Sequence, residues 1–431
     1  MGKTALEPFW EARFEGSSYG FRPGRGCHEA IQKRFYWGRP NTKRPWVLDA
    51  DLEGACDHIG HSALVPAIGH FPARGLVKQW RNAGYGEDAR QHPTDTGVPQ
   101  GGVRSPLLLN VARHGLEHAL GSSYTPRGTL RGTSALVRYA ADLAVLCPTQ
   151  QAAIDAQPLL AMGLGTRGLR WSAAQPHMRH LTEGFDFLGF NIRHDPVPQS
   201  SRRGDKRLIT PSQGSIQQIQ RKLKARWRQQ VGSPTVARIN AMNPLISGWR
   251  QYFRIGVASR VFADLDAFMY ARAQRDMQRR HPRQAGWWRP QKYWGQTRGP
   301  RRDRWVFQDH ERHATLRQFA WTRMVRHRLA PKTYSPDDPP LQDYWRQRQS
   351  RPQALADRPR HLASRQQGCC PVCLQGLENG AALHVHHVLP KQHGGTDDLA
   401  NLCLVHANCH RQSHSRSAPL GVRRWLEPCT R

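Results

Sequence analysis

Apolar residues recur along this chain at two spacings, and the spacing changes from one region to the next. In the first half they form short runs such as Trp46–Leu48 and Ala135–Val137, whose length and composition predict strands. Between Ile216 and Trp227 they recur every three or four positions instead, which predicts an amphipathic helix. A mixed region of strands and helices is therefore expected before a purely helical one.

A hairpin and a helical bundle follow from the same patterns. The run Leu136–Leu146 is apolar on both sides of Tyr139–Asp142, so the chain is expected to turn there and pair its flanks. Two apolar and aromatic segments, Leu245–Phe253 and Phe262–Phe268, come after the amphipathic helix. With that helix they predict a small bundle.

Charge changes the picture of this bundle. The chain of 431 residues carries a formal charge of +32, and residues 201–330 hold 29 Lys and Arg against 7 Asp and Glu. Nucleic acid is the natural partner, because neutralising phosphates releases their counterions. An anionic membrane is the rival partner, but these cations are interleaved with Trp and Tyr rather than gathered on one amphipathic helix.

The candidate RNA contacts lie on two segments of the basic region. Cations on the first helix would track phosphates, and Trp287, Trp288, Tyr293 and Trp294 would stack on unpaired bases. A solvated charged face with buried tryptophans is the alternative. The predicted contacts are Arg221, Lys222, Lys224, Arg226, Arg228, Arg279, Arg280, Arg289 and Lys292.

Length and composition also bound the domain count and the compartment. The length favours two to four domains. No apolar run is long enough to span a bilayer, and Met1–Leu6 is not an apolar signal segment, so an intracellular protein is expected. Six of the 9 cysteines lie between Cys369 and Cys429, where an intracellular chain uses them as metal ligands before disulfides.

The cysteine-rich end predicts a zinc-stapled module. Cys370 and Cys373 form one pair with two residues between them, and His406 and Cys409 form a second. Four nitrogen and sulfur ligands in such pairs suit tetrahedral Zn²⁺, and so small a fold needs the staple. Unpaired buried cysteines are the alternative. The two other cysteines of the module are expected to be core residues or neighbours: Cys369 and Cys403.

Between these pairs, His384–Pro390 carries two adjacent histidines. Neighbours on a strand point to opposite faces, so His386 can hold a metal while His387 faces a water. Asn401 lies 14 residues after His387, and His410 lies 23 residues after His387. This segment resembles the HNH (ββα-metal) nucleases, with His406 at a place where many members have cysteine.

The HNH resemblance implies specific roles. His387 would deprotonate the attacking water, and Asn401 would orient His387 and steady the loop. His386 and His410 would hold one Mg²⁺ or Mn²⁺ against the scissile phosphate. A purely structural zinc fold with incidental histidines is the alternative.

Two acids in the first half have the placement of polymerase metal ligands. Asp51 ends an apolar strand and Asp142 follows the hairpin turn; two carboxylates a few ångströms apart can hold two Mg²⁺ ions. Gly97–Gly102, which includes Gln100, is a glycine-rich loop that lets backbone approach a substrate. Asp49 is expected to be a structural acid.

With Ser18–Arg25, Leu181–Phe190 and Asn243–Trp249, these motifs resemble group II intron-encoded reverse transcriptase/maturases, in the family's order and over nearly the whole chain. The resemblance implies binding of intron RNA, help in its splicing, nicking of target DNA and copying of RNA into DNA, in a bacterial cytoplasm. It adds Arg22 and Arg25 to the expected nucleic-acid contacts.

The expected fold is α+β and multidomain. Reverse-transcriptase-like fingers and palm are expected at 1–195, and a helical maturase (thumb/X) domain at 205–330. Little apolar content predicts a linker at 331–365, and the HNH module follows at 366–415.

The chain departs from the family at the polymerase site. The family turn Tyr-Ala-Asp-Asp is here Tyr139-Ala140-Ala141-Asp142, so the first catalytic acid is missing at Ala141. Losing one metal carboxylate removes several kcal/mol of transition-state stabilisation. We therefore expect reverse transcription to be crippled or absent, with weak binding of a single cation by Asp51 and Asp142 as the alternative.

Other departures concern the substrate side of the palm. Cys56 replaces an aromatic that screens nucleotides, and Gln175-Pro176 replaces a Lys-Thr pair. The start also lacks the family's upstream fingers segment. Three interpretations stay open: a maturase with a working nuclease, a non-catalytic RNA chaperone with a structural zinc fold, and a decayed product that barely folds.

Overall fold

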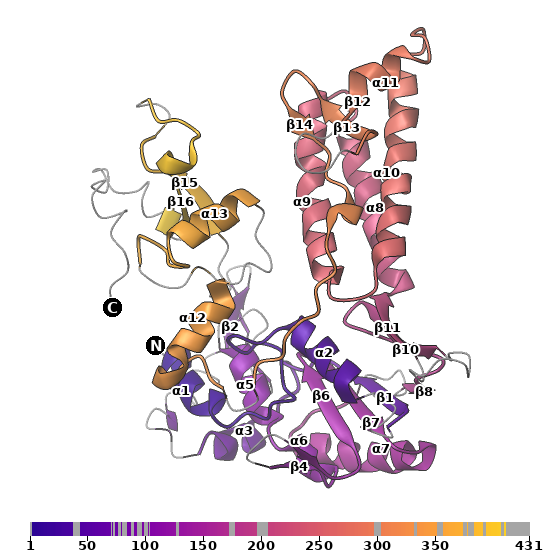
Figure 1. The fold of residues 1–431 in the computed structure, drawn as a ribbon. Helices are drawn as coiled ribbons and strands as arrows, with labels where there is room; N and C mark the ends of the chain where they lie inside the picture. The colour runs from indigo at the N-terminus through magenta and orange to yellow at the C-terminus, as the bar shows by residue number, and fades with distance from the viewer. Residues whose placement is uncertain are drawn as a thin grey trace. The chain divides into compact units, whose positions relative to one another are not determined.

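The structure is a computed structural model, and it forms two compact units, 1–333 and 334–431 (Figure 1). We describe each unit by itself. The described residues are 2–37, 44–69, 71, 74–75, 79, 84–87, 90–92, 97–98, 102, 104–125, 129–171, 177–195, 206–296, 303–331, 334–350, 357–373, 377, 383–390, 394–406 and 409–410.

A four-stranded antiparallel sheet forms the centre of the first unit. The apolar runs expected to be strands are β1 (Trp46–Asp51), β6 (Ala135–Tyr139) and β7 (Asp142–Cys147), and β8 (His177–His180) joins them. The order is β6-β7-β1-β8. The predicted hairpin is the β6–β7 pair, in which Tyr139 lies opposite Asp142.

Both faces of this sheet are buried, which explains why its strands are apolar at successive positions. On one face, Val47 and Val137 pack with α2 (Cys27–Trp37). On the other, Leu48 and Leu136 share a core with several helices. Those helices are α1 (Gly2–Glu11), α3 (His61–Ile68), α5 (Ser105–Ala112), α6 (Leu116–Ala119) and α7 (Gln150–Gly165).

A second sheet carries the chain from the palm into the helices. Its strands are β9 (Phe185–Phe187), β10 (Phe190–Asp195) and β11 (Lys206–Pro211), in the order β11-β10-β9. β11 pairs with β10 across the expected boundary at 195–205. One core also runs from Val47 in the palm to Trp227 and Phe319 in the helical region, so the two predicted domains share a single hydrophobic interior.

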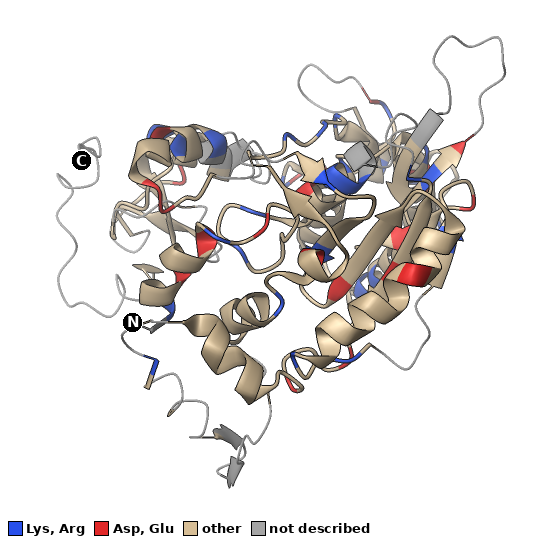
Figure 2. Ribbon diagram, turned by 90° about the horizontal axis from the view of Figure 1, so that it is seen from below, with Lys and Arg blue, Asp and Glu red and all other residues tan. Residues whose placement is uncertain are grey.

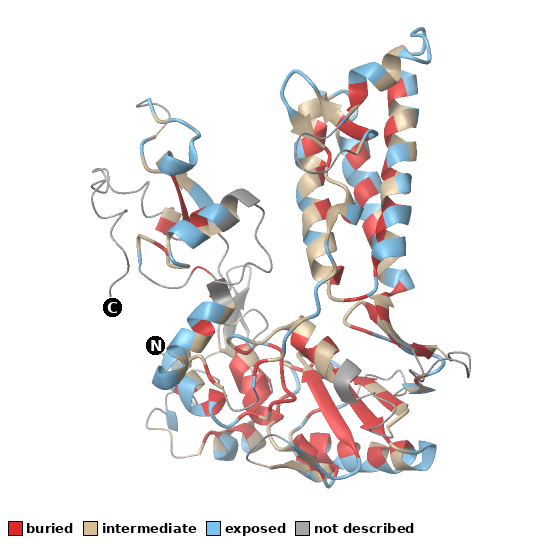
Figure 3. Cartoon of the chain, viewed as in Figure 1, coloured by how far each residue is buried: buried red, intermediate tan, exposed pale blue. Residues whose placement is uncertain are grey.

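The predicted helical bundle is confirmed. Helices α8 (Gln213–Gln229), α9 (Thr235–Phe253) and α10 (Ser259–Arg280) run side by side (Figure 1). Their buried positions face inward and their exposed positions outward (Figure 3). Helix α11 (Trp288–Tyr293) and the strands β12 (Trp294–Gly295), β13 (Val306–Asp309) and β14 (Ala314–Thr315) pack at one end, and η2 (Phe319–Trp321) lies against α9 and α10.

Two short hairpins complete the first unit. They are β2 (Tyr85–Glu87) with β3 (Arg90–His92), and β4 (Ser123–Tyr124) with β5 (Leu130–Arg131). Among the described residues, helices of either unit are too short or too polar to cross a membrane.

The second unit is built on the hairpin of β15 (Leu383–His387) and β16 (Leu402–His406), with η5 (Leu399–Asn401) before β16. The segment expected to be a linker, 331–365, holds η3 (Pro339–Leu341), α12 (Gln342–Ser350) and α13 (Asp357–Arg365). Leu362 of α13 is buried in the core of the hairpin. Arg365 donates to the carbonyl oxygens of Leu399 and Leu402. Polar composition hid α13, because only one side of a short helix needs apolar residues here.

Candidate functional sites

The two polymerase acids lie next to each other at one end of the palm sheet. Asp51 on β1 is directly opposite Asp142 on β7. The hairpin turns through Ala140 and Ala141, and Ala140 has a left-handed φ of 48°. The Tyr-Ala-Asp-Asp turn has its first aspartate at the position of Ala141, directly before Asp142. The missing carboxylate would therefore lie beside this pair of acids.

The environment of Asp142 disfavours its charged form. Burial, followed by the nearby carboxylates of Asp51 and Asp49, raises the pKa of Asp142 to about 6. Asp49 keeps the structural role expected of it, because its carboxylate lies 3.7 Å from Nη2 of Arg34. Arg34 is fully buried on α2, and its guanidinium carbon lies 3.2 Å from the ring centroid of Phe187. Burial lowers the pKa of Arg34 to about 9.

The turn is held by the Ser18–Arg25 segment and by two residues that the sequence did not single out, Asn110 and Arg113. A Cβ on Gly20 would lie 2.1 Å from the backbone nitrogen of Ala140, so the Ser18–Arg25 segment passes directly against the turn. Nη1 of Arg113 donates to the carbonyl oxygen of Ala140, and Nδ2 of Asn110 donates to that of Gly20 at 2.9 Å. Burial lowers the pKa of Arg113 to about 9.

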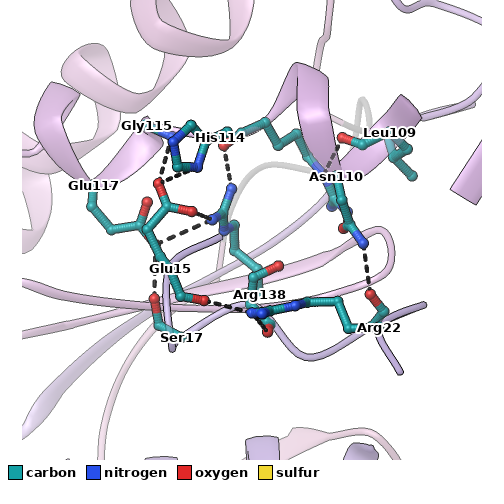
Figure 4. A network of polar contacts seen from close by, with 12 residues as sticks. Glu15, Ser17, Arg22, Leu109, Asn110, His114, Gly115, Glu117 and Arg138 are labelled. Atoms are coloured by element: carbon teal, nitrogen blue, oxygen red, sulfur yellow. Dashed lines mark hydrogen bonds and ion pairs between the residues drawn. The ribbon is translucent and has the colours of Figure 1, made fainter. Parts of the chain in front are cut away.

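A buried ionic network continues below this support (Figure 4). Arg138 binds Glu15 and lies 3.4 Å from Glu117, and Oγ of Ser17 donates to Glu117 at 2.8 Å. Although burial opposes it, Arg138 holds the pKa of Glu15 well below its usual range. Burial raises the pKa of Glu117. Glu15 and Arg138 lie 123 positions apart in the chain, and Ser17 and Glu117 lie 100 apart, so local patterns carry no trace of these pairs.

Arg22 and Arg25 do not fit the phosphate contacts expected of them. Arg22 donates to both oxygens of Glu11, at 2.9 to 3.2 Å, and to the carbonyl oxygens of Glu15 and Ser18. Its side chain is 1 % exposed and that of Arg25 is 2 % exposed. Arg25 donates to the carbonyl oxygens of Ala330 and Pro331. Both arginines therefore hold the N-terminal segment in place within the protein.

The cations of α8 do have the placement that phosphate contact requires. Ile219, Leu223 and Trp227 are buried, while the five cations of this helix are exposed. They are Arg221, Lys222, Lys224, Arg226 and Arg228. In the palm, by contrast, basic and acidic positions are interspersed (Figure 2).

The second basic segment is only partly available. Arg279 and Lys292 are exposed, but Arg280 and Arg289 donate to the carbonyl oxygens of Ser233 and His281. The aromatic residues divide in the same way. Tyr293 and Trp294 are core residues, whereas Trp287 is 65 % exposed. Base stacking thus remains possible for Trp287 and not for the two buried rings.

The four expected zinc ligands converge. One ligand atom from each of Cys370, Cys373, His406 and Cys409 lies within 4.8 Å of the others. Nδ1 of His406 is 3.3 Å from Sγ of Cys373 and 3.9 Å from Sγ of Cys409. Three thiols and one imidazole at this spacing fit tetrahedral Zn²⁺.

Cys403 is a core residue, as expected. It packs in the core of the second unit, and burial raises the pKa of its thiol to about 12. Cys403 does not belong to the group of four residues whose ligand atoms converge.

The two adjacent histidines of β15 separate as strand geometry requires. The ring centroids of His386 and His410 lie 5.2 Å apart at 84°, and those of His384 and His410 lie 5.1 Å apart. Nε2 of His387 lies 2.8 Å from Oδ1 of Asp397. The imidazoles of His386 on β15 and of His410 can face one divalent cation. The imidazole of His387 contacts Asp397 instead.

Asn401 steadies the loop, but the partner of His387 is Asp397. The side-chain amide of Asn401 donates to the carbonyl oxygens of Leu389 and Thr396, at 3.0 and 2.8 Å. Its side-chain oxygen accepts from the backbone nitrogen of Leu389 at 2.8 Å. Within the described part of this loop, those are the hydrogen bonds of the Asn401 side chain. The acidic pair after Gly394-Gly395 was visible in the sequence, but only the folded loop distinguishes Asp397 from its neighbour.

Three residues considered above lie outside the described residues. They are Gln100, Gln175 and Pro176.

Comparisons with known proteins match three successive parts of the chain to three protein families. Residues 1–192 match the reverse transcriptase (RNA-dependent DNA polymerase) family, residues 216–294 the group II intron, maturase-specific domain, and residues 370–416 the HNH endonuclease family. The matches confirm the expected combination of domains.

Three curated relatives have related sequences. Protein YkfC of Escherichia coli is 29% identical over 48% of this chain and 61% of its own length. The group II intron-encoded protein LtrA of Lactococcus lactis is 37% identical over 27% of this chain and 19% of its own. An uncharacterized 91 kDa protein in the cob intron of Schizosaccharomyces pombe is 32% identical, over 27% and 14%.

The chain spans less than two thirds of the length of each of these relatives. Its three domain matches nevertheless follow one another in a single order, from polymerase through maturase to nuclease. The chain thus joins regions that match a reverse transcriptase domain, a maturase-specific domain and an HNH endonuclease domain, and it is similar in sequence to group II intron-encoded proteins.

Proposed function

We propose that this protein binds an intron RNA, assists its splicing and mobility, and cleaves target DNA with its HNH module. The observation that carries the nuclease proposal is the division of labour on β15. His386 lies against His410, whereas the neighbouring His387 lies on the other side against Asp397. A metal site and a separate base are the two components that phosphodiester hydrolysis needs.

In this mechanism His387 takes the proton of the attacking water. His386 and His410 would hold a Mg²⁺ or Mn²⁺ ion, which would polarise the scissile phosphate and stabilise the leaving oxygen. Cys370, Cys373, His406 and Cys409 would hold Zn²⁺ as a structural ion. Asn401 ties the loop after β15 to the start of β16, so the base and the metal ligands keep their positions.

RNA binding is assigned to the bundle. The exposed cations of α8 offer a row of positive charge over a buried apolar side, and such a row suits the phosphates of a folded RNA. The match of residues 216–294 to the maturase-specific domain supports intron RNA as that partner.

Reverse transcription is proposed to be impaired. Ala141 supplies no carboxylate beside Asp51 and Asp142, so the site has one oxygen ligand group fewer with which it would hold divalent cations. A rate loss of roughly a thousandfold or more is the expected consequence.

A plasmid nicking assay tests the nuclease. The full-length protein and a His387→Ala variant are incubated with supercoiled plasmid and Mg²⁺ or Mn²⁺, with and without intron RNA, and EDTA serves as the metal-free control. Nicking by the parent and a large decrease in the nicking rate of the variant are expected. A folded, zinc-loaded parent that leaves the plasmid intact under all these conditions would favour a non-catalytic RNA-binding maturase whose zinc module is structural.

A further inference from the structure

His387, the proposed general base, contacts a carboxylate. This contact plays no part in metal binding, which the proposal assigns to other histidines. Nε2 of His387 lies 2.8 Å from Oδ1 of Asp397. The His387 side chain is 29 % exposed and that of Asp397 is 57 % exposed. The pair therefore lies at the surface, where a nucleic-acid backbone can reach it.

This contact determines which nitrogen of His387 is free. An ionised carboxylate only accepts hydrogen bonds, so Nε2 of the imidazole must carry the hydrogen and donate it to Asp397. In the neutral ring the lone pair is then on Nδ1. A ring held in this way presents Nδ1 as the atom that can accept a proton from water.

The loop that carries Asp397 is built to hold it there. Asn401 bonds to both Leu389 and Thr396, which lie on either side of the loop. The nitrogen of Val388 donates to the carbonyl oxygen of Asn401 at 2.8 Å. A Cβ on Gly395 would lie 1.8 Å from the carbonyl oxygen of Leu389, so only glycine allows the loop to close this tightly.

The neighbouring acid is used differently. Oδ2 of Asp398 accepts from Oγ1 of Thr396 at 2.9 Å, and its carbonyl oxygen accepts from the nitrogen of Asn401. Asp398 thus belongs to the loop's internal bonding, whereas Oδ1 of Asp397 points to the ring of His387. The two adjacent acids therefore form a natural comparison.

From this geometry we infer that Asp397 is the positioning residue of the nuclease. It fixes the ring of His387 with Nδ1 toward the attacking water and faces the positive charge that the ring gains. In the reaction the water oxygen bonds to phosphorus, and the proton of the water moves to Nδ1. The bond from phosphorus to the leaving sugar oxygen breaks, and that oxygen takes a proton from solvent. The inference rests on the proposed nuclease function.

Single-turnover nicking by the full-length protein tests the inference. Asp397→Ala is expected to lower the rate constant at saturating protein by roughly 10- to 100-fold, the usual effect of losing an outer partner of a metal-site histidine. The affinity for DNA should stay unchanged, because Asp397 contacts the base and not the substrate. Asp397→Asn keeps an acceptor for Nε2 without the charge, and it should recover part of the loss. Asp398→Ala is the matched control and should nick at nearly the parental rate.

A double substitution separates positioning from a general effect on the module. The double variant His387→Ala with Asp397→Ala should nick at the same rate as His387→Ala alone. The reason is that Asp397 then has no imidazole to orient. Zinc content and melting temperature, measured on each variant, should match the parent. An additive loss in the double variant, or an Asp397→Ala protein that nicks like the parent, overturns the inference and leaves the nuclease proposal intact. A parent that never nicks overturns both.

Discussion

Asp51 and Asp142 lie directly opposite each other across β1 and β7, and Ala141 precedes Asp142 in the hairpin turn. A strand acid with a Tyr-Ala-Asp-Asp turn would supply three acids, and the palm keeps two of them in register, on a turn contacted by Arg113 and Gly20. One side chain separates this site from a complete set of metal ligands. The palm can thus be tested by putting that side chain back.

Ala141→Asp should restore cation binding in the palm. A third carboxylate at the turn would give two divalent cations a shared set of oxygen ligands. Mn²⁺ titration followed by electron paramagnetic resonance should show additional bound Mn²⁺, and Asp51→Asn in the same protein should remove it. Primer extension on an RNA template should rise together with the binding. A variant that binds no more Mn²⁺ than the parent would mean that more than Ala141 has been lost.

The pKa of Asp142 predicts a stability that falls as pH rises. Its folded-state pKa, about 6, lies above the usual value of 3.8, so between those values the folded state holds the proton more tightly than the unfolded one. Stability is therefore greater below this window and decreases from about pH 4 to pH 6. Asp142→Asn should remove that decrease and stabilise the first unit by about 1 kcal/mol at pH 7, after allowance for partial exposure. Thermal melts across this pH range test it, with Asp155→Asn on the exposed side of α7 as the control.

Gly20→Ala should destabilise the palm. The new Cβ would lie 2.1 Å from the backbone nitrogen of Ala140, and neither backbone can move without breaking the contacts of the hairpin. Forced overpacking of this kind costs about 1–3 kcal/mol or more. Gly26→Ala is the matched control, since a Cβ there meets no described atom within 4 Å. Equal urea midpoints for the two variants would contradict the close approach of Gly20 to the turn.

Removing zinc should unfold the second unit while leaving the first unit intact. The core of the second unit is small, with Leu362 and Leu404 among its few buried side chains, and metal binding of roughly 10–16 kcal/mol stabilises such folds. A strong chelator, or Cys373→Ser, should open the chain to proteolysis beyond residue 334 while 1–333 resists. Metal analysis should find one zinc per chain in the parent. Full protease resistance after chelation would count against a structural metal.

Neutralising the cations of α8 should weaken RNA binding and its dependence on salt. Each lost phosphate contact lowers the slope of log K against log salt by about 0.7 to 0.9. Lys224→Gln combined with Arg228→Gln should therefore reduce the slope by about 1.5. A control that removes the same charge from the palm, Arg131→Gln with Arg170→Gln, should change it little. Equal slopes for the two double variants would argue against α8 as the RNA-binding side.

The sequence alone was sufficient for the features that depend on local order. Periodicity identified β1, the β6–β7 hairpin and the helices of the bundle, because a buried face repeats at fixed intervals along one element. Ligand spacing identified the zinc set from Cys370 to Cys409, since two closely spaced pairs already limit where a metal can sit. The loss at Ala141 needed only the alignment of one turn.

Only the tertiary structure decided which charged groups face substrates and which face one another. Arg22 and Arg25 occupy a motif that suggested phosphate contact, but Glu11 and the carbonyl oxygen of Ala330 take up their guanidinium groups. Asp397 and Asp398 are adjacent and identical in type, so the sequence does not distinguish them. In the folded loop Asp397 contacts His387, whereas Asp398 accepts from Thr396. A buried charge is stable only beside a partner, and that partner can come from any distance along the chain. The choice is therefore made by packing and cannot be read from neighbouring residues.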